Sequence, residues 1–143
     1  MYEIRSATPL DFEGINFVSA HLAYKNLSND ESKRKLDQLF NSETDFVYVA
    51  ESKGIIIAWL HLFLARRLAS NDFFEIAGLV VNPNKRGVGV GKSLINHVMN
   101  KYQSSIRVRC NKNRTEAHKF YEKIGFENKK VQKVFEKQSN TKE

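Results

Sequence analysis

One stretch of this chain, residues 79–93, constrains its fold more than any other. An apolar run is followed by a short turn at Pro83 and then by three glycines at alternate positions, Gly87, Gly89 and Gly91. An amphipathic pattern comes next, so the predicted order is strand, turn, glycine-rich loop and helix. Glycine leaves the backbone bare, and the first amides of a helix have no acceptor within it. The segment therefore predicts an anion site of the kind that holds phosphate groups.

Basic residues border the glycines and would add full positive charges to this site: Lys85, Arg86 and Lys92. Two well-known phosphate loops do not fit the sequence. A P-loop ends as Gly91-Lys92-Ser93 does, but its first glycine would fall on Arg86. The dinucleotide-binding fingerprint would pair Gly87 with Gly89, but it needs a third glycine where Lys92 stands. The loop therefore belongs to another class of phosphate site.

Apolar periodicity predicts an alternation of strands and helices along the rest of the chain. We expect strands over residues 2–5, 46–50, 55–64, 73–81 and 106–110, and one or two more within 126–136. We expect helices from Thr8, after Asn29, from about Val88 and over 113–124. In the last helix, Asn113 is predicted to cap the start and Gly125 to end it. This order indicates a mixed α/β layer fold.

Composition narrows the class of protein. The chain has 143 residues, the usual length of one domain, and a net charge of +7. Its single cysteine, Cys110, excludes an intrachain disulfide and a Cys/His metal cluster. No secretion signal is recognisable, and the longest apolar run, residues 55–65, is too short to span a bilayer. The sequence thus predicts a cytoplasmic protein without membrane association, in which residues 138–143 form a disordered polar tail.

Two motifs resemble those of the GNAT N-acetyltransferase superfamily. Residues 86–91, Arg-Gly-Val-Gly-Val-Gly, look like its Gln/Arg-x-x-Gly-x-Gly/Ala signature, and residues 79–83 resemble its fourth strand and the exit from it. About thirty residues later, 116–126 resemble its C-terminal helix motif, with an alanine, a Phe-Tyr pair and a closing Gly-Phe. Many members carry an asparagine where this chain has Arg114, with Asn113 one residue earlier.

The resemblance implies a fold and a cofactor. The fold would be a single α/β domain over residues 1–137, with a mostly antiparallel twisted sheet, splayed between strands four and five, and about four helices. The cofactor would be acetyl-CoA, as acyl donor. Its contacts would come from Leu79, Val80, Val81, Arg86, Gly87, Val88, Gly89, Val90, Gly91, Lys92, Ser93 and Asn113.

The resemblance also implies direct attack of a primary amine on acetyl-CoA in a ternary complex. Tyr121 would then protonate the leaving thiolate; the alternative is a ring that only packs on the apolar stripe of its helix. Glu75, the one charge in the run 73–81, is a candidate base because burial would raise its pKa towards neutrality. It could instead face solvent and pair with Arg66 or Arg67. Gly78 suggests a bulge whose neighbouring amides stabilise the oxyanion, or a residue kept small for packing.

Other functions stay open at this stage. The same fold could serve as a non-catalytic CoA-binding or regulatory module. The positive charge also suits nucleic acid, but we find no recognisable binding motif for it. No sequence motif identifies the acceptor amine. His61 could lie beside the acceptor pocket or be a half-buried histidine with hydrogen-bond partners in the core. An acidic patch for a cationic acceptor could come from Asp30, Glu31, Glu43 and Asp45, and a homodimer could form through the C-terminal strands.

Overall fold

The computed structural model of this chain describes residues 1–20 and 27–140, and it divides into two compact units, Met1–Arg109 and Cys110–Glu143. Three residues of the predicted polar tail, 141–143, lie outside the described residues. In the part that the structure describes, no helix is long and apolar enough to cross a membrane.

A five-stranded sheet forms the centre of the first unit, with its strands in the sequential order β1-β2-β3-β4-β5. The first four strands pair antiparallel, and β5 pairs parallel to β4. This confirms the predicted mixed α/β fold. The strands are β1 (Glu3–Ser6), β2 (Asp45–Ser52), β3 (Ile55–Ala65), β4 (Phe73–Val81) and β5 (Ile106–Val108).

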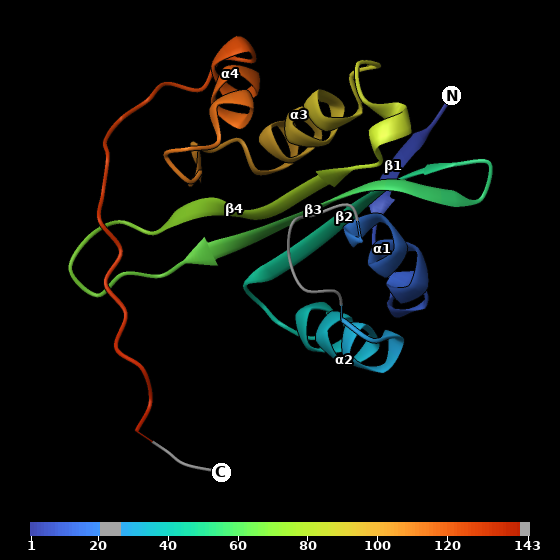
Figure 1. The fold of residues 1–143 in the computed structure, drawn as a ribbon, viewed down its shortest axis with the longest axis horizontal. Coiled ribbons are helices and arrows are strands. Elements are labelled where there is room, and N and C mark those ends of the chain that lie inside the picture. Colours follow the sequence, from blue (N-terminus) through green and yellow to red (C-terminus); the bar gives the residue numbers. More distant parts are fainter. Residues whose placement is uncertain (21–26, 141–143) are drawn as a thin grey trace. The chain divides into compact units, whose positions relative to one another are not determined.

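Helices cover both faces of this sheet, with α1 and α2 on one side and α3 on the other (Figure 1). Side chains that alternate along a strand reach opposite layers. On β3, the Trp59 Nε1 donates to Ser19 Oγ of α1 over 3.0 Å, whereas on β2 the Tyr48 and Tyr102 hydroxyls join the sheet to α3 over 2.6 Å. The helices are α1 (Phe12–Ser19), α2 (Asn29–Phe40) and α3 (Val90–Tyr102), with short 3₁₀ turns at Pro9–Asp11 and Pro83–Lys85.

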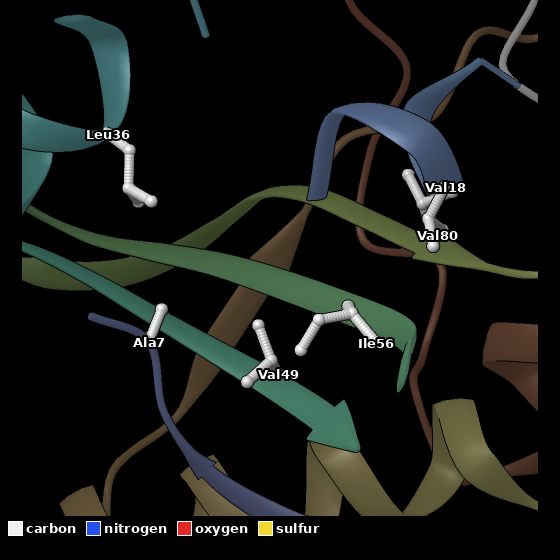
Figure 2. Packing of buried hydrophobic residues seen from close by; sticks show 6 residues of the cluster. All are labelled: Ala7, Val18, Leu36, Val49, Ile56 and Val80. Carbon is white, nitrogen blue, oxygen red and sulfur yellow. The ribbon is translucent and has the colours of Figure 1, made fainter. Parts of the chain in front are cut away.

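One part of the hydrophobic core lies between the sheet and the α1–α2 layer, and the buried Leu94 and Val98 of α3 belong to the part on the other face. Figure 2 shows Val18 of α1 against Val80 of β4, with Val49 and Ile56 on the neighbouring strands below them. Val18 and Val49 are fully buried. Leu36 on α2 completes this layer and belongs to the same apolar cluster. The core thus fixes the positions of β3 and β4, which carry the candidate site.

Local sequence signals set the starts of α1 and α2 and the turn of the β2–β3 hairpin. Before α1, Thr8 N donates to Asp11 Oδ2 over 2.8 Å. Before α2, Ser28 and Glu31 form a reciprocal capping box, with each side chain accepting from the other's backbone amide. Lys53 and Gly54 both have positive φ, at 52° and 79°, which suits the tight turn between β2 and β3.

The second unit contains α4 (Thr115–Lys123), which ends in a Schellman motif. Gly125 has φ +106°, and Phe126 N donates to Tyr121 O over 2.9 Å. The Phe126 and Tyr121 rings meet with centroids 5.3 Å apart, which is the apolar contact this motif favours. The predicted terminator is confirmed, and the closing Gly-Phe of the C-terminal motif has a structural reason.

Two predictions for this unit are wrong. Asn113 does not cap α4: Arg114 occupies the cap position, because Asn113 N instead donates to Asn111 Oδ1 in the preceding turn. Residues 126–136 form no strand in the described structure. Phe126 packs on Tyr121, and the remaining apolar residues, Val131, Val134 and Phe135, are spaced three and one apart, so no alternating face exists for a strand to bury.

Candidate active site

A cradle of backbone amides lies where β4 passes into α3. Gly87 and Gly89 both adopt the left-handed region, with φ +86° and +83°, and Gly89 is the N-cap of α3. The first bond of the helix runs from Ser93 N to Gly89 O over 2.9 Å. The amides of Gly89, Val90, Gly91 and Lys92 therefore precede the first bonded amide and have no acceptor within the helix. Such a helix start favours an anion.

The cradle is open on its outer side and anchored on its inner side. A Cβ added at Gly87 or Gly89 would meet no atom within 4 Å, so both glycines are required by backbone conformation and not by crowding. Val90 is 1% exposed and fixes the loop to the core. The other predicted contacts of the loop are exposed, and they are Lys85, Arg86, Val88 and Lys92.

Ser93 differs from the other predicted contacts. Its hydroxyl forms a 2.7 Å hydrogen bond with the hydroxyl of Tyr2, which ties the first turn of α3 to the N-terminus. Gly91, in the same turn, is buried. Both residues can still contribute backbone amides or close packing, but the Ser93 side chain is already engaged.

A β-bulge interrupts β4 next to Gly78. His61 pairs with Gly78, but Leu62 pairs with Ile76, so Ala77 is the extra residue. A Cβ at Gly78 would lie 2.9 Å from Cη2 and Cζ3 of Trp59. The predicted bulge beside Gly78 is confirmed, and so is the packing interpretation, because an indole ring lies where a side chain at this position would be.

The second half of β4 has one edge without a strand partner in the described chain. The parallel pairing with β5 ends at Ile76 and Val108, whereas β4 continues to Val81. In an antiparallel ladder, alternate residues direct their N–H and C=O groups away from the partner strand. Leu79, Val80 and Val81 thus include backbone groups that face this free edge, on the way to the cradle.

Glu75 is buried on β4 and forms an ion pair. Arg109 Nε donates to its Oε1 over 3.2 Å, and the Glu75 and Arg109 side chains are 10% and 58% exposed. Neither Arg66 nor Arg67 is its partner, so that alternative is wrong. Arg109 could not be found from the sequence, because the contact depends on the register of two strands 34 positions apart.

His61 and Asp45 form a second polar pair. His61 Nε2 lies 2.8 Å from Asp45 Oδ1, and Ser42 Oγ donates to Asp45 Oδ2 over 2.8 Å. Both side chains are about one fifth exposed. Asp45 is thus already engaged, and Glu31 serves as a helix cap, so two of the four residues of the predicted acidic patch have structural partners.

In the second unit, the Tyr121 ring contacts two aromatic rings, with centroid distances of 5.1 Å to Phe120 and 5.3 Å to Phe126. The pKa of Tyr121 is raised to about 12, mainly by burial and also by the nearby Cys110, whereas Arg114 opposes the shift. The hydroxyl therefore stays protonated throughout the neutral range. Burial also raises the pKa of the Cys110 thiol, which disfavours a nucleophilic thiolate.

Metal ligation finds no support within residues 1–20 and 27–140, where no group of three or more His, Cys, Asp or Glu side chains is placed to hold an ion.

Comparison with solved structures places the fold. The chain is 17% identical to aminoglycoside N-acetyltransferase AAC(6')-Iy in complex with CoA, over 97% of this chain and 96% of that one, with a TM-score of 0.86. The same enzyme bound to the bisubstrate analog CoA-S-monomethyl-acetylneamine is 17% identical to this chain. The match covers 97% of this chain and 99% of that one, with a TM-score of 0.84. Glucosamine-6-phosphate N-acetyltransferase from Arabidopsis thaliana is 21% identical, over 95% and 98% of the two chains, with a TM-score of 0.80. At these identities the likeness establishes a shared fold.

Sequence comparison establishes the family. A search of curated protein sequences finds no match at the required significance. The model of the acetyltransferase (GNAT) family, however, matches residues 15–126, and these residues include the glycine loop, β4 and α4. Since this match covers most of the sequence, the chain belongs to the acetyltransferase (GNAT) family.

Proposed function

We propose that this protein transfers the acetyl group of acetyl-CoA to a primary amine by direct attack. The observation that carries the proposal is the start of α3, where left-handed Gly87 and Gly89 leave four helix-start amides without helical acceptors. Family membership supports the same activity. The family match runs through both compact units, which supports one acetyltransferase domain over residues 1–137.

The pyrophosphate of CoA would lie on this cradle. Amides from Gly87 to Lys92 would donate to the phosphate oxygens, and Arg86 and Lys92 would add positive charge. The pantetheine arm would run along the free edge of β4, where backbone groups of Leu79, Val80 and Val81 are available. Two further contacts are proposed from the family resemblance alone, namely the backbone of Ser93 and the side chain of Asn113.

The reaction needs two substrates bound at once. The neutral amine nitrogen forms a bond to the thioester carbonyl carbon, the C–S bond breaks, and CoA leaves as a thiolate. The amine loses one proton and the thiolate gains one, so the products are an N-acetyl amide and the CoA thiol. The binding of a bisubstrate analog by AAC(6')-Iy, which has a similar fold, supports this part of the proposal.

Tyr121 is the proposed acid. Its pKa of about 12 keeps a proton on the hydroxyl at neutral pH, as an acid for the thiolate requires. Replacement by Phe keeps the packing against Phe120 and Phe126 and removes only the hydroxyl. We expect Tyr121→Phe to lower kcat by about 10²-fold while leaving the KM for acetyl-CoA nearly unchanged. An unchanged kcat would remove Tyr121 from the mechanism.

Glu75 is the proposed base, acting directly or through a bridging water. Arg109 occupies its Oε1, which leaves Oε2 to accept the amine proton. Glu75→Gln should lower kcat while leaving the KM for acetyl-CoA nearly unchanged. Arg109→Gln, which breaks the ion pair but keeps the carboxylate, should retain most of the activity. If Glu75→Gln keeps the wild-type kcat, the base lies elsewhere.

The experiment that tests the function is release of the CoA thiol from acetyl-CoA, measured across a panel of primary amines. Amine-dependent release together with an N-acetylated product supports the proposal. Lys53→Gln changes an exposed residue in the β2–β3 turn and serves as the control for the Tyr121 and Glu75 variants, because it should keep wild-type activity on the same panel. Saturable binding of acetyl-CoA without turnover on any amine would favour a non-catalytic CoA-binding module.

A further inference from the structure

Two arginines stack on one aromatic ring at the end of the sheet where β3 finishes and β4 begins. The Cζ atom of Arg107 lies 3.9 Å from the centroid of the Phe73 ring, and that of Arg67 lies 5.2 Å from it. The two guanidinium groups are thus no farther apart than the sum of these two distances. Both distances fall within the range of a cation–π contact.

These arginines share a face with the proposed base. Directly paired residues of neighbouring strands point to the same side of a sheet, and so do residues two apart on one strand. Glu75 is paired with Arg107 on β5 and with Phe63 on β3, and it stands two residues after Phe73. Glu75, Phe73 and Arg107 therefore lie on one face, which is also the face of Trp59.

Neither stacked arginine has a counter-ion among the described residues. Both side chains are exposed, and the ion pairs that form in this part of the chain involve other residues. Asp72 accepts from the backbone amide of Arg67, not from its guanidinium group. Arg109, the third arginine of this region, is already paired with Glu75.

Over this ring, neither guanidinium group donates a hydrogen bond to another described residue, so the N–H donors on its edge are free. That edge matches the paired oxygens of a carboxylate or phosphate. Two arginines fixed on one ring also lose less side-chain freedom on binding than two arginines in solvent. If Arg67 and Arg107 only packed on Phe73, two adjacent positive charges would lack a negative partner in a chain whose net charge is already +7.

We propose that the acceptor amine carries an anionic group, a phosphate or a carboxylate, which Arg67 and Arg107 bind while the amine lies at Glu75. This inference rests on the proposed acetyl transfer. Two residues along a strand span about 7 Å, so the amine and the anion of a fitting acceptor are roughly 6–9 Å apart. Acceptors of this class differ from polycations, for which this region offers repulsion.

The first test measures anion binding without turnover. The protein is saturated with CoA, so that the cradle at α3 is occupied, and inorganic phosphate is titrated by calorimetry. We expect saturable binding to the wild type, at least about fivefold weaker binding to Arg67→Gln and to Arg107→Gln, and no change in Arg66→Gln. Arg66→Gln is the matched control, because it removes an exposed charge from the same loop.

The second test compares matched acceptors and identifies the anion. The pairs are glucosamine 6-phosphate with glucosamine, and trialanine with trialanine amide. We expect kcat/KM to favour the anionic member of at least one pair by about tenfold, and this preference to vanish in the double variant Arg67→Gln/Arg107→Gln, with the KM for acetyl-CoA unchanged. The pair that shows the preference distinguishes phosphate from carboxylate.

Failure of this inference differs from failure of the proposed function. If CoA binds but phosphate does not, or if phosphate binds the arginine variants as it binds the wild type, only the anionic-acceptor inference is overturned. A preference for the neutral member of both pairs overturns it as well. If CoA itself fails to bind, the proposed acetyl transfer falls, and this inference falls with it.

Discussion

Replacing Gly78 by alanine should displace the single tryptophan of this protein. The new Cβ would lie 2.9 Å from Cη2 and Cζ3 of Trp59, whereas carbon atoms in contact prefer about 3.5–4.0 Å. The ring must therefore move. It cannot move freely, because Trp59 Nε1 donates to Ser19 Oγ over 3.0 Å and Ser19 Oγ donates to Ile15 O over 2.7 Å.

The expected cost follows from three contributions. Overpacking costs about 1–3 kcal/mol. Weakening the Trp59–Ser19 hydrogen bond costs about 0.5–1.5 kcal/mol. The lower entropy of alanine in the unfolded chain returns about 0.4–1 kcal/mol. With mid-range values for the three contributions, we expect Gly78→Ala to lower the free energy of unfolding by about 2 kcal/mol.

Urea denaturation followed by tryptophan fluorescence measures both effects together, since Trp59 is the only tryptophan. The native emission maximum should shift in Gly78→Ala. In a double-mutant cycle, Ser19→Ala should cost less in the Gly78→Ala background than in the wild type, because the hydrogen bond is already weakened. A Gly78→Ala protein with wild-type stability and emission would refute this account of the β4 bulge region.

Three further changes test other contacts. Gly14→Ala should destabilise the fold in urea although alanine favours a helix by about 1 kcal/mol, because its Cβ would lie 2.6 Å from Cγ1 of Ile56; equal or higher stability contradicts this. Asp11→Asn should lower the free energy of unfolding by about 1 kcal/mol at neutral pH, because hydrogen bonds from Arg5 hold the pKa of Asp11 below its usual value. This stabilisation is present above the pKa of Asp11 in the unfolded chain and is lost as the pH falls through its pKa in the folded protein. A stability difference between wild type and Asp11→Asn that persists in acid would contradict it. The pKa of Tyr121 in the folded protein is about 12, so its contribution to the free energy of unfolding is complete below pH 10 and is lost between pH 10 and 12. Wild type should therefore lose more stability than Tyr121→Phe between pH 10 and 12, and equal losses would argue against a buried hydroxyl.

Local signals of the sequence predicted most of the fold because they act over a few residues. The terminator at Gly125, for example, determines the end of α4 within one turn of chain. The glycine loop was predicted for the same reason. Positive φ and free helix-start amides are consequences of residue type and of position next to a helix.

Contacts between distant strands could not be predicted in this way. The pairing of Glu75 with Arg109 and the stack of Arg107 on Phe73 depend on the parallel register of β4 and β5, which nothing local encodes. Asn113 does not cap α4, because its backbone amide donates to the side chain of Asn111, which forms a competing turn just before the helix.

The central claim is that the loop before α3 binds the pyrophosphate of acetyl-CoA, and the free energy of unfolding with and without this ligand tests it most directly. At about one hundred times its dissociation constant, a ligand that binds only the folded state adds about 2.7 kcal/mol. We predict this stabilisation for the wild type and for Gly54→Glu, and its loss in Gly89→Glu. Gly54 is the matched control, because it has a similar φ of +79° and equally open surroundings in the β2–β3 turn. Absence of stabilisation in the wild type, or equal stabilisation of both variants, would contradict the claim.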